Sequence, residues 1–270
     1  MLVRDFEVTT PIEHLSTVLL LPAIGILLGL GTVVSTLLGG RRPARLLALW
    51  LAVGASVGVV TLGIVVLISG QEIRASIGEV LGFPVIALRY DALSGPFLLA
   101  HGAVGVAASI FGLGYGGHDD TSRQRIFAAY PLFLGSLLLV FGAADAFAFL
   151  LAWELMALSS AALVIGTTPS REVARAGYLY LAMTHVATAA LIVAFAILGA
   201  HAGSTSFLAF GAAAASLPGI TRDVVFVLLL VGFGTKAGAI PFHVWLPRAH
   251  PVAPAHVSAL MSGVMIKAGI

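Results

Sequence analysis

The sequence predicts an all-α membrane protein, a polytopic bundle of transmembrane helices, and two observations lead to this prediction. Hydrophobic residues make up 59% of the 270 residues and charged residues only 10%, whereas a soluble domain has about 25% charged residues. Apolar runs also recur along the chain at the length of a crossing, since a hydrocarbon layer of about 30 Å takes about 20 helical residues. A chain of this length holds about eight crossings, which leaves no room for a soluble domain.

Seven apolar runs predict complete transmembrane helices, and an eighth run begins near residue 254. The eighth run meets the chain end at Ile270 without a closing polar tail. We therefore expect residues 1–270 to form a single membrane domain of about eight helices, the last one cut short, in a fragment of a longer protein. The seven complete runs cover residues 15–38, 46–69, 93–115, 127–142, 144–166, 176–199 and 223–241.

Two connections are long enough to form structure of their own. Residues 71–93 are too polar for a crossing, and within them residues 88–92 alternate sides like a short strand, which predicts an ordered cap outside the membrane. Residues 200–220 are rich in Gly, Ala and Ser around an apolar patch at residues 207–210. This composition suits either a helix lying on the surface or a loose loop, and the sequence leaves both open.

Basic residues predict the orientation, because Lys and Arg are held back on the cytoplasmic side of a membrane. The connections after the first, third, fifth and seventh runs hold Arg41, Arg42, Arg45, Arg123, Arg125, Arg171, Arg175 and Arg248, and the other side holds Arg4, Arg74, Arg89 and Arg222. This distribution predicts a multi-pass protein of the cell's inner, or cytoplasmic, membrane with its N-terminus outside. Lys236 and Lys267 lie inside runs instead.

Charge and cysteine content exclude several functions. The formal net charge is +2, and the scattered basic residues form no cluster that could follow a nucleic acid backbone. The chain contains no Cys, so it has no disulfides or iron–sulfur clusters of its own, and redox chemistry would belong to a partner. No nucleotide-binding loop, nucleophile elbow or hydrolase carboxylate pair is present. We expect no cofactor and no bond-breaking catalysis by the chain itself.

Two ionisable residues inside predicted crossings carry the functional prediction. Glu154 lies near the middle of the fifth run, where a charge persists only if it is paired, hydrated or functional. Lys236 lies beside Gly234, Gly238 and Pro241, which predict a helix break with unpaired backbone carbonyls. Transporters build ion sites at such breaks, so we predict that Lys236 carries a proton in one state and is neutral in another, with Glu154 as the modulating partner. The structural alternatives are a helix-pairing glutamate and a lysine that reaches the interface.

Four further residues extend this candidate path for protons. Lys267 follows His256 by 11 residues, close to three helical turns, which would place both on one face of the eighth helix. His256 can instead cap the helix or face water. His185, in the sixth run, can relay a proton or hold two helices together. His243 completes the set, and because His243, His250 and His256 lack the spacing of metal-binding helices, we expect no metal site.

Three segments together resemble the antiporter-like membrane subunits shared by respiratory complex I, energy-converting hydrogenases and multisubunit cation/proton antiporters. They are Trp153-Glu-Leu-Met, the stretch from Gly234 to Leu260 with its Thr-Lys-Ala-Gly-Ala-Ile-Pro-Phe-His-Val-Trp core, and Val264-Met-Ile-Lys-Ala-Gly-Ile. The stretch from Pro247 to Lys267 and the segment Tyr180-Leu-Ala-Met-Thr-His look most like the hydrogenase-4 and formate hydrogenlyase branch. The resemblance covers nearly the whole chain but only the first inverted-repeat half of the family's fold, in which the seventh helix is broken.

The resemblance implies roles for three residues and a set of partners. In this family a glutamate on helix five, a lysine of the broken helix seven and a lysine on helix eight form the proton-translocating line, and Glu154, Lys236 and Lys267 stand at the matching positions. It implies a proton-translocating subunit of a redox-driven complex, with other membrane subunits and a peripheral hydrogenase or quinone reductase module. The alternatives are a subunit of a multisubunit sodium/proton antiporter, which would also carry sodium, and a structural scaffold.

Overall fold

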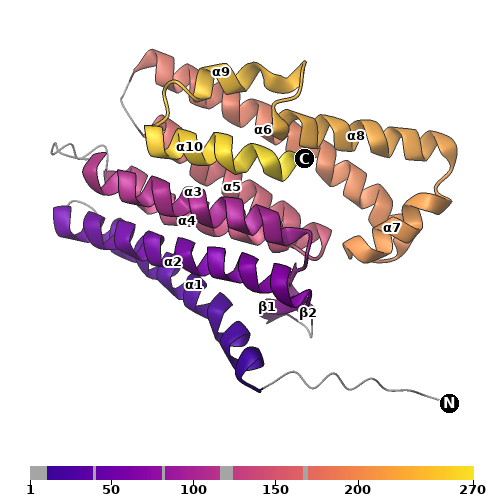
Figure 1. Ribbon diagram of the computed structural model, residues 1–270. Coiled ribbons are helices and arrows are strands. Elements are labelled where there is room, and N and C mark those ends of the chain that lie inside the picture. The colour runs from indigo at the N-terminus through magenta and orange to yellow at the C-terminus, as the bar shows by residue number, and fades with distance from the viewer. Residues whose placement is uncertain (1–10, 39–40, 81–82, 116–123, 167–169) are drawn as a thin grey trace.

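The computed structural model describes residues 11–38, 41–80, 83–115, 124–166 and 170–270. Each of the seven predicted crossings is a helix, and the all-α fold class is confirmed (Figure 1). Arg4 and Arg123, which contribute to the predicted orientation, lie outside the described residues. The seven helices are α1 (Pro11–Leu38), α2 (Arg42–Ser69), α3 (Ser94–Tyr115), α4 (Gln124–Gly142), α5 (Ala146–Ile165), α6 (Arg171–Ala202) and α8 (Gly219–Ala237).

The outside of the bundle is apolar, as a lipid-facing surface must be. Large side chains such as Ile68 and Val186 are 82% and 66% exposed, which would be costly over so wide an area in water. Within the described residues, six segments are long and apolar enough to cross a membrane. The chain is therefore a multi-pass membrane protein. The six segments are Leu19–Leu38, Arg42–Ser69, Ser94–Gly114, Ala146–Ile165, Arg171–Ala202 and Gly219–Ala249.

Small residues let α2 and α3 pack with their backbones in close approach. A Cβ atom added to Gly102 would lie 2.6 Å from the backbone nitrogen of Val60 and 2.7 Å from the carbonyl oxygen of Ser56. One turn further along α3, a Cβ atom on Gly105 would lie 2.6 Å from Ser56 Oγ. Close approach of this kind is a main source of association between membrane helices, because lipid gives them no hydrophobic driving force.

A β-hairpin closes one end of the bundle between α2 and α3. Strands β1 (Ile73–Val80) and β2 (Phe83–Tyr90) pair antiparallel, with Ile73 opposite Tyr90. The sequence predicted only a short strand near residues 88–92. The alternation of polar and apolar residues within one strand does not show which other strand pairs with it. Tyr90 is fully buried and donates to the carbonyl of Leu138 at 3.1 Å. Gly142 makes room for its ring, since a Cβ atom there would meet it.

Ion pairs order the base of this hairpin. Arg74 and Arg89 stand directly opposite each other in the strand register, and Glu72 contacts both, at 2.8 Å and 3.4 Å. Arg89 also pairs with Asp91 at 2.6 Å, and Asp91 accepts the N–H of Ser94 at the start of α3. Partial burial alone would raise the pKa of Asp91, but the hydrogen bonds from Arg89 and Ser94 and the charge of Arg89 outweigh burial and lower that pKa from its ordinary value.

The connection between α4 and α5 is held between the hairpin and the chain that precedes α7. On one side Ala144 donates to the carbonyl of Ala87 in β2 at 2.9 Å. On the other side Ala146 donates to the carbonyl of Thr205 at 2.9 Å, and Asp145 pairs with Ser206 as an isolated bridge. Asp145 also caps α5, because its side chain accepts the N–H groups of the first turn. The start of α5 is thereby fixed on both sides.

The connection after α6 is helical, so the helix alternative was the correct one. Helix α7 (Phe207–Ser216) begins shortly after α6 ends. Its Phe207 packs edge to face on Phe149 of α5 and on Phe195 of α6, with ring centroids 5.8 Å and 5.6 Å apart. Figure 1 shows α7 and the hairpin at the same end of the bundle, opposite the end where α2 and α6 begin. This arrangement gives the bundle two distinct ends.

The predicted break in the seventh crossing is confirmed. Helix α8 ends at Ala237, where Gly238 takes the left-handed backbone conformation (φ 73°) that favours glycine. Pro241 follows and has no N–H with which to continue a helix. The chain then forms a 3₁₀ turn, η2 (Phe242–Trp245), and the short helix α9 (Leu246–Ala249).

The eighth run differs from its prediction. It forms α10 (Ala255–Gly263) and then a 3₁₀ segment, η3 (Met265–Gly269), because the backbone at Val264 (φ −130°, ψ −56°) leaves the α-helical conformation. The expectation that His256 and Lys267 share one face assumed a continuous α-helix and is wrong in that respect, since a 3₁₀ segment advances three residues per turn. Segment η3 packs against the end of α8: a Cβ atom on Gly269 would lie 2.6 Å from the carbonyl oxygen of Phe233.

Candidate functional site at the break in α8

Lys236 is buried at the end of α8, in the last turn before the break. Its side chain is only 1% exposed, which makes it one of the largest fully buried side chains among the described residues. Its ammonium nitrogen lies 3.2 Å from the hydroxyl oxygen of Tyr180 on α6. A buried lysine without compensating contacts is costly, so the groups around Lys236 decide whether it can hold a proton.

Tyr180 continues this contact into a chain of hydrogen bonds. Its hydroxyl lies 2.7 Å from Ser160 Oγ on α5. Ser160 Oγ also lies 2.6 Å from the carbonyl of Met156, which can only accept. With its single hydroxyl hydrogen donated there, Ser160 accepts from Tyr180. Tyr180 in turn accepts from Lys236. The three hydrogen bonds therefore run in one direction, from the ammonium of Lys236 to the carbonyl of Met156. All three side chains are buried.

Aromatic rings enclose the same ammonium group. The nitrogen of Lys236 lies 5.4 Å from the ring centroid of Trp153 and 5.4 Å from that of Tyr180, within the range of cation–π attraction. The ring of Tyr180 also stacks on Trp245 of η2, with centroids 4.9 Å apart. Both tryptophans are fully buried. These rings exclude lipid and hold the ammonium in place.

Two of the carbonyl groups freed by the break, those of Gly234 and Thr235, are paired, which corrects the expectation from the sequence for these two groups. The carbonyl of Gly234 accepts the N–H of Ala239 at 2.8 Å. The carbonyl of Thr235 accepts the N–H of Gly238 at 3.2 Å and the indole N–H of Trp245 at 2.7 Å. The turn after α8 and the Trp245 side chain thus satisfy two of the carbonyl groups at the helix end.

Glu154 of α5 and His185 of α6 are brought together. His185 Nδ1 lies 2.7 Å from the carbonyl of Leu181, so that nitrogen carries a hydrogen. Its Nε2 lies 3.4 Å from Glu154 Oε2. This contact is attractive only when a proton resides on one of the two groups, because a neutral histidine would otherwise turn a lone pair toward a carboxylate. The pair is therefore a place where one proton can be shared.

Glu154 lies close enough to Lys236 to act on it electrostatically, although no direct ion pair joins them among the described residues. The second carboxyl oxygen of Glu154, Oε1, is buried and has no hydrogen-bond partner within the described chain. A buried polar atom of this kind is costly, so a proton or water molecule is expected to bind there. The site thus consists of the contact between Glu154 and His185 and the buried amino group of Lys236.

The other predicted residues lie apart from this pair. Lys267 donates to the carbonyl of Ser262 at 2.6 Å, a group that the end of α10 releases. His243 lies in η2, and its Nδ1 is buried without a partner in the described part of the chain. His256 is 4% exposed and meets the ring of Tyr130 edge-on, with centroids 5.4 Å apart. Within the described residues, none of these three is hydrogen-bonded to Lys236.

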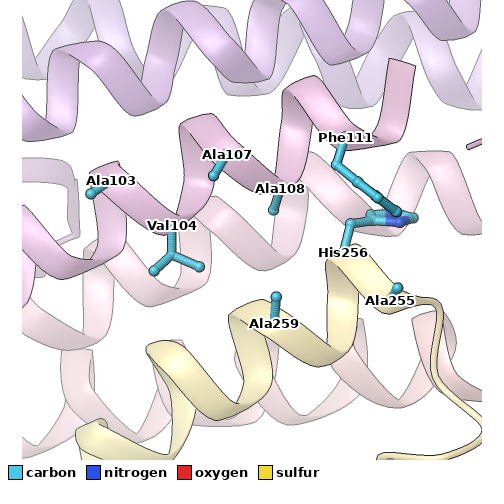
Figure 2. Close-up of a pocket in the computed structure, with 8 residues that line it drawn as sticks. All are labelled: Ala103, Val104, Ala107, Ala108, Phe111, Ala255, His256 and Ala259. Atoms are coloured by element: carbon cyan, nitrogen blue, oxygen red, sulfur yellow. The ribbon is translucent and has the colours of Figure 1, made fainter. Parts of the chain in front are cut away.

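His256 lies instead at a groove between α3 and α10. The groove has a volume of about 530 Å³, and Figure 2 shows the side chains of His256 and Phe111 meeting at one end of it. Most of the remaining lining consists of alanine methyl groups. The lining residues are Ala103, Val104, Ala107, Ala108, Phe111, Ala255, His256 and Ala259. The groove therefore opens onto His256, not onto Lys236 or Glu154.

The sequence reasoning missed the residues that surround the lysine. Tyr180 contacts the lysine directly and Ser160 and Trp245 contact Tyr180, yet none was a candidate. A signal was available for Tyr180, since a tyrosine in an apolar run needs a partner for its hydroxyl. Its distance of 56 residues from Lys236 along the chain hides which partner it has.

In the described ranges, no three His, Asp or Glu side chains gather as a metal site requires.

Comparison with known proteins adds a family and several relatives. The family model described as NADH:quinone oxidoreductase/Mrp antiporter, TM, matches residues 143–270. An uncharacterized protein of Mycobacterium tuberculosis is 39% identical over 81% of this chain and 33% of its own length. Hydrogenase-4 component B of Escherichia coli is 36% identical over 75% of this chain and 30% of its own length.

A solved structure shows the same arrangement of helices. A chain of the membrane-bound sulfane sulfur reductase, an archaeal respiratory membrane complex, superimposes with a TM-score of 0.78 at 26% identity. The match covers 93% of this chain and 39% of that one. The chain thus spans about a third of the length of the curated relatives that it matches.

Proposed function

Because the chain belongs to the family of antiporter-like membrane subunits found in NADH:quinone oxidoreductases and Mrp antiporters, we propose that it is a proton-translocating subunit of a redox-driven membrane complex. The observation that carries this proposal is the buried ammonium of Lys236 at the break in α8, held by Tyr180 and Trp153 and acted on electrostatically by Glu154. Ionisable groups inside a membrane protein mark ion paths. The complete path belongs to the full-length subunit, within which we propose that residues 1–270 act as one membrane domain.

The surroundings of Lys236 support protons over sodium as the transported ion. A sodium site at a helix break uses free backbone carbonyls as ligands. Here the carbonyls of Gly234 and Thr235 already accept N–H groups from the turn and from Trp245. Sodium/proton antiport remains the second candidate function, favoured by the Mrp antiporters that share the family model. Sodium-dependent proton exchange in vesicles without an electron donor would support it.

We further propose that the protein lies in the inner membrane with its N-terminus outside and assembles with other membrane subunits and a peripheral hydrogenase or quinone reductase module. The orientation is supported by the bundle's two ends, since Arg41, Arg42, Arg171 and Arg175 stand at or near the starts of α2 and α6, opposite the hairpin (Figure 1). The partners are supported by hydrogenase-4 component B among the relatives.

Purification of the tagged full-length protein from gently solubilised membranes tests the partners. We expect hydrogenase or quinone reductase subunits to be identified by mass spectrometry in the purified complex. An assembly that contains only other small membrane subunits would move the assignment to the antiporter alternative. A tagged, unrelated membrane protein of the same cells serves as the control for nonspecific recovery.

Replacing Glu154 with Gln is expected to lower proton translocation by about 10²-fold, because the side chain keeps its shape but no longer shares a proton with His185. The measurement is the pH gradient formed by vesicles that contain the full-length subunit in its complex. Glu172→Gln is the matched control, since Glu172 is exposed at the start of α6 and should be neutral to transport. Wild-type translocation in the Glu154→Gln variant would remove Glu154 from the path.

A further inference from the structure

We propose that Tyr180 is a positioning residue for proton transfer at Lys236. The hydroxyl oxygen of Tyr180 accepts a hydrogen bond from the Lys236 ammonium and so stabilises the protonated lysine at the break. This inference rests on the proposed function and goes beyond it, because it names a group that controls when Lys236 gives up its proton. Tyr180 does not itself have to carry the proton. Its role follows from the direction of the hydrogen bonds around it.

The direction of the hydrogen bonds is set at Ser160, the residue furthest from the lysine in this series. Ser160 donates to the carbonyls of its own helix, at 2.6 Å to Met156 and 3.0 Å to Ala157. It therefore offers Tyr180 only a lone pair, and the hydroxyl hydrogen of Tyr180 turns toward Ser160 at 2.7 Å. The sulfur of Met265, at 3.5 Å, is a second and weaker acceptor for the same hydrogen. The oxygen lone pairs of Tyr180 are left facing the ammonium of Lys236.

Within the described residues, the hydrogen bond to Tyr180 is the only one that the Lys236 nitrogen makes. Apart from Tyr180, the ammonium meets the ring of Trp153. A hydrogen bond to a charged group is stronger than one between neutral groups. If it is lost in a buried site, the desolvation free energy of the charged group is no longer offset. Removing the Tyr180 oxygen therefore disfavours the protonated lysine while leaving its aromatic surroundings in place.

The location of Tyr180 links this contact to the break itself. Its ring stacks on Trp245, and Trp245 donates to the carbonyl of Thr235, the residue before Lys236. Tyr180 is thus packed between the side chain of Lys236 and the turn that ends α8. The hydroxyl and the helix end are positioned together, so the oxygen stays within reach of the lysine.

The test compares pH profiles of proton translocation in vesicles that contain the full-length subunit in its complex. At high pH translocation falls when Lys236 no longer takes up a proton. In Tyr180→Phe, which keeps the ring and its stacking, we expect this fall to move to lower pH by about one unit. Tyr178→Phe is the matched control, because Tyr178 lies two residues away on α6 with its side chain exposed, and its profile should match the wild type.

A second pair of variants tests the direction of the hydrogen bonds. Ser160→Ala frees the hydroxyl hydrogen of Tyr180 to turn toward Lys236 and should shift the profile the same way, by less. Ser159→Ala is its control, since the Ser159 hydroxyl bonds only to carbonyls of its own helix. This pair decides the matter if Tyr180→Phe fails to assemble.

The outcomes separate this inference from the proposed function. If Lys236→Met loses translocation but Tyr180→Phe or, in its place, Ser160→Ala keeps the wild-type profile, then the role of Tyr180 is wrong and the proposed function stands. An equal shift in Tyr178→Phe or Ser159→Ala also overturns the role of Tyr180. If Lys236→Met translocates protons normally, the role of Tyr180 and the proposed function are both wrong.

Discussion

Replacing Lys236 with Met should reduce proton translocation by about 10²-fold or more while the complex still assembles, because proton transfer by a positioned group is lost. Met fits the site, since it is unbranched and apolar and the side chain of Lys236 is 1% exposed among aromatic rings. The substitution also removes a buried charge, so it should not destabilise the fold. The measurement is the pH gradient formed per turnover of the complex in vesicles.

Two further variants make this result specific. Arg222→Met removes a positive charge from the exposed start of the same helix and should leave translocation unchanged. Lys236→Arg keeps the charge but cannot release a proton at physiological pH, so it should be as inactive as Lys236→Met. Full activity in Lys236→Arg would show that translocation needs the positive charge at this position but not the release of a proton from it. The proton-exchange role of Lys236 would then be abandoned.

Gly102→Ala should lower the free energy of unfolding by about 3 kcal/mol, the upper end for overpacking, because its new methyl group meets backbone atoms of α2 as well as the side chain of Val60. The Cβ atom would lie 2.6 Å from the nitrogen of Val60 and 2.7 Å from the carbonyl oxygen of Ser56. Neither atom can move without separating α2 from α3. The measurement is the thermal unfolding of the protein in detergent, with a lower Tm expected.

Gly114→Ala is the control on the same helix. A Cβ atom there meets nothing within 4 Å, so the Tm should be unchanged or slightly higher, as alanine favours a helix over glycine. If Gly102→Ala unfolds at the wild-type temperature, α2 and α3 have a looser packing than the structure shows. A loss in both variants would point to a general effect of the methyl group on α3.

The crossings and the break could be predicted from the sequence because both are local properties. An apolar run of sufficient length becomes a helix in lipid whatever surrounds it. Gly238 and Pro241 end a helix through their own backbone restrictions. Lys236 and Glu154 stood out for the same reason, since a charged residue in an apolar run is visible without knowing its neighbours.

The features that the sequence missed depend on contacts between distant residues. The hairpin needs the register between Ile73 and Tyr90, which neither strand shows alone. The eighth run was predicted to continue as one α-helix, but its backbone changes at Val264. Tyr180 gains its role only through packing against Lys236, and Trp245 only by reaching Thr235. Composition carries no record of which helices lie side by side.

The break in α8 also has an electrical consequence. The peptide groups of a helix add up to a dipole whose C-terminal end carries about half a negative charge, and this field is strongest within the last turn. A continuous crossing would place that pole at the membrane surface, whereas α8 ends at Ala237, inside the bundle, one residue beyond Lys236. The break therefore brings the negative pole of a helix to a buried cation. If residues 238–241 joined α8 to α9 as one helix, this pole would move away from the lysine.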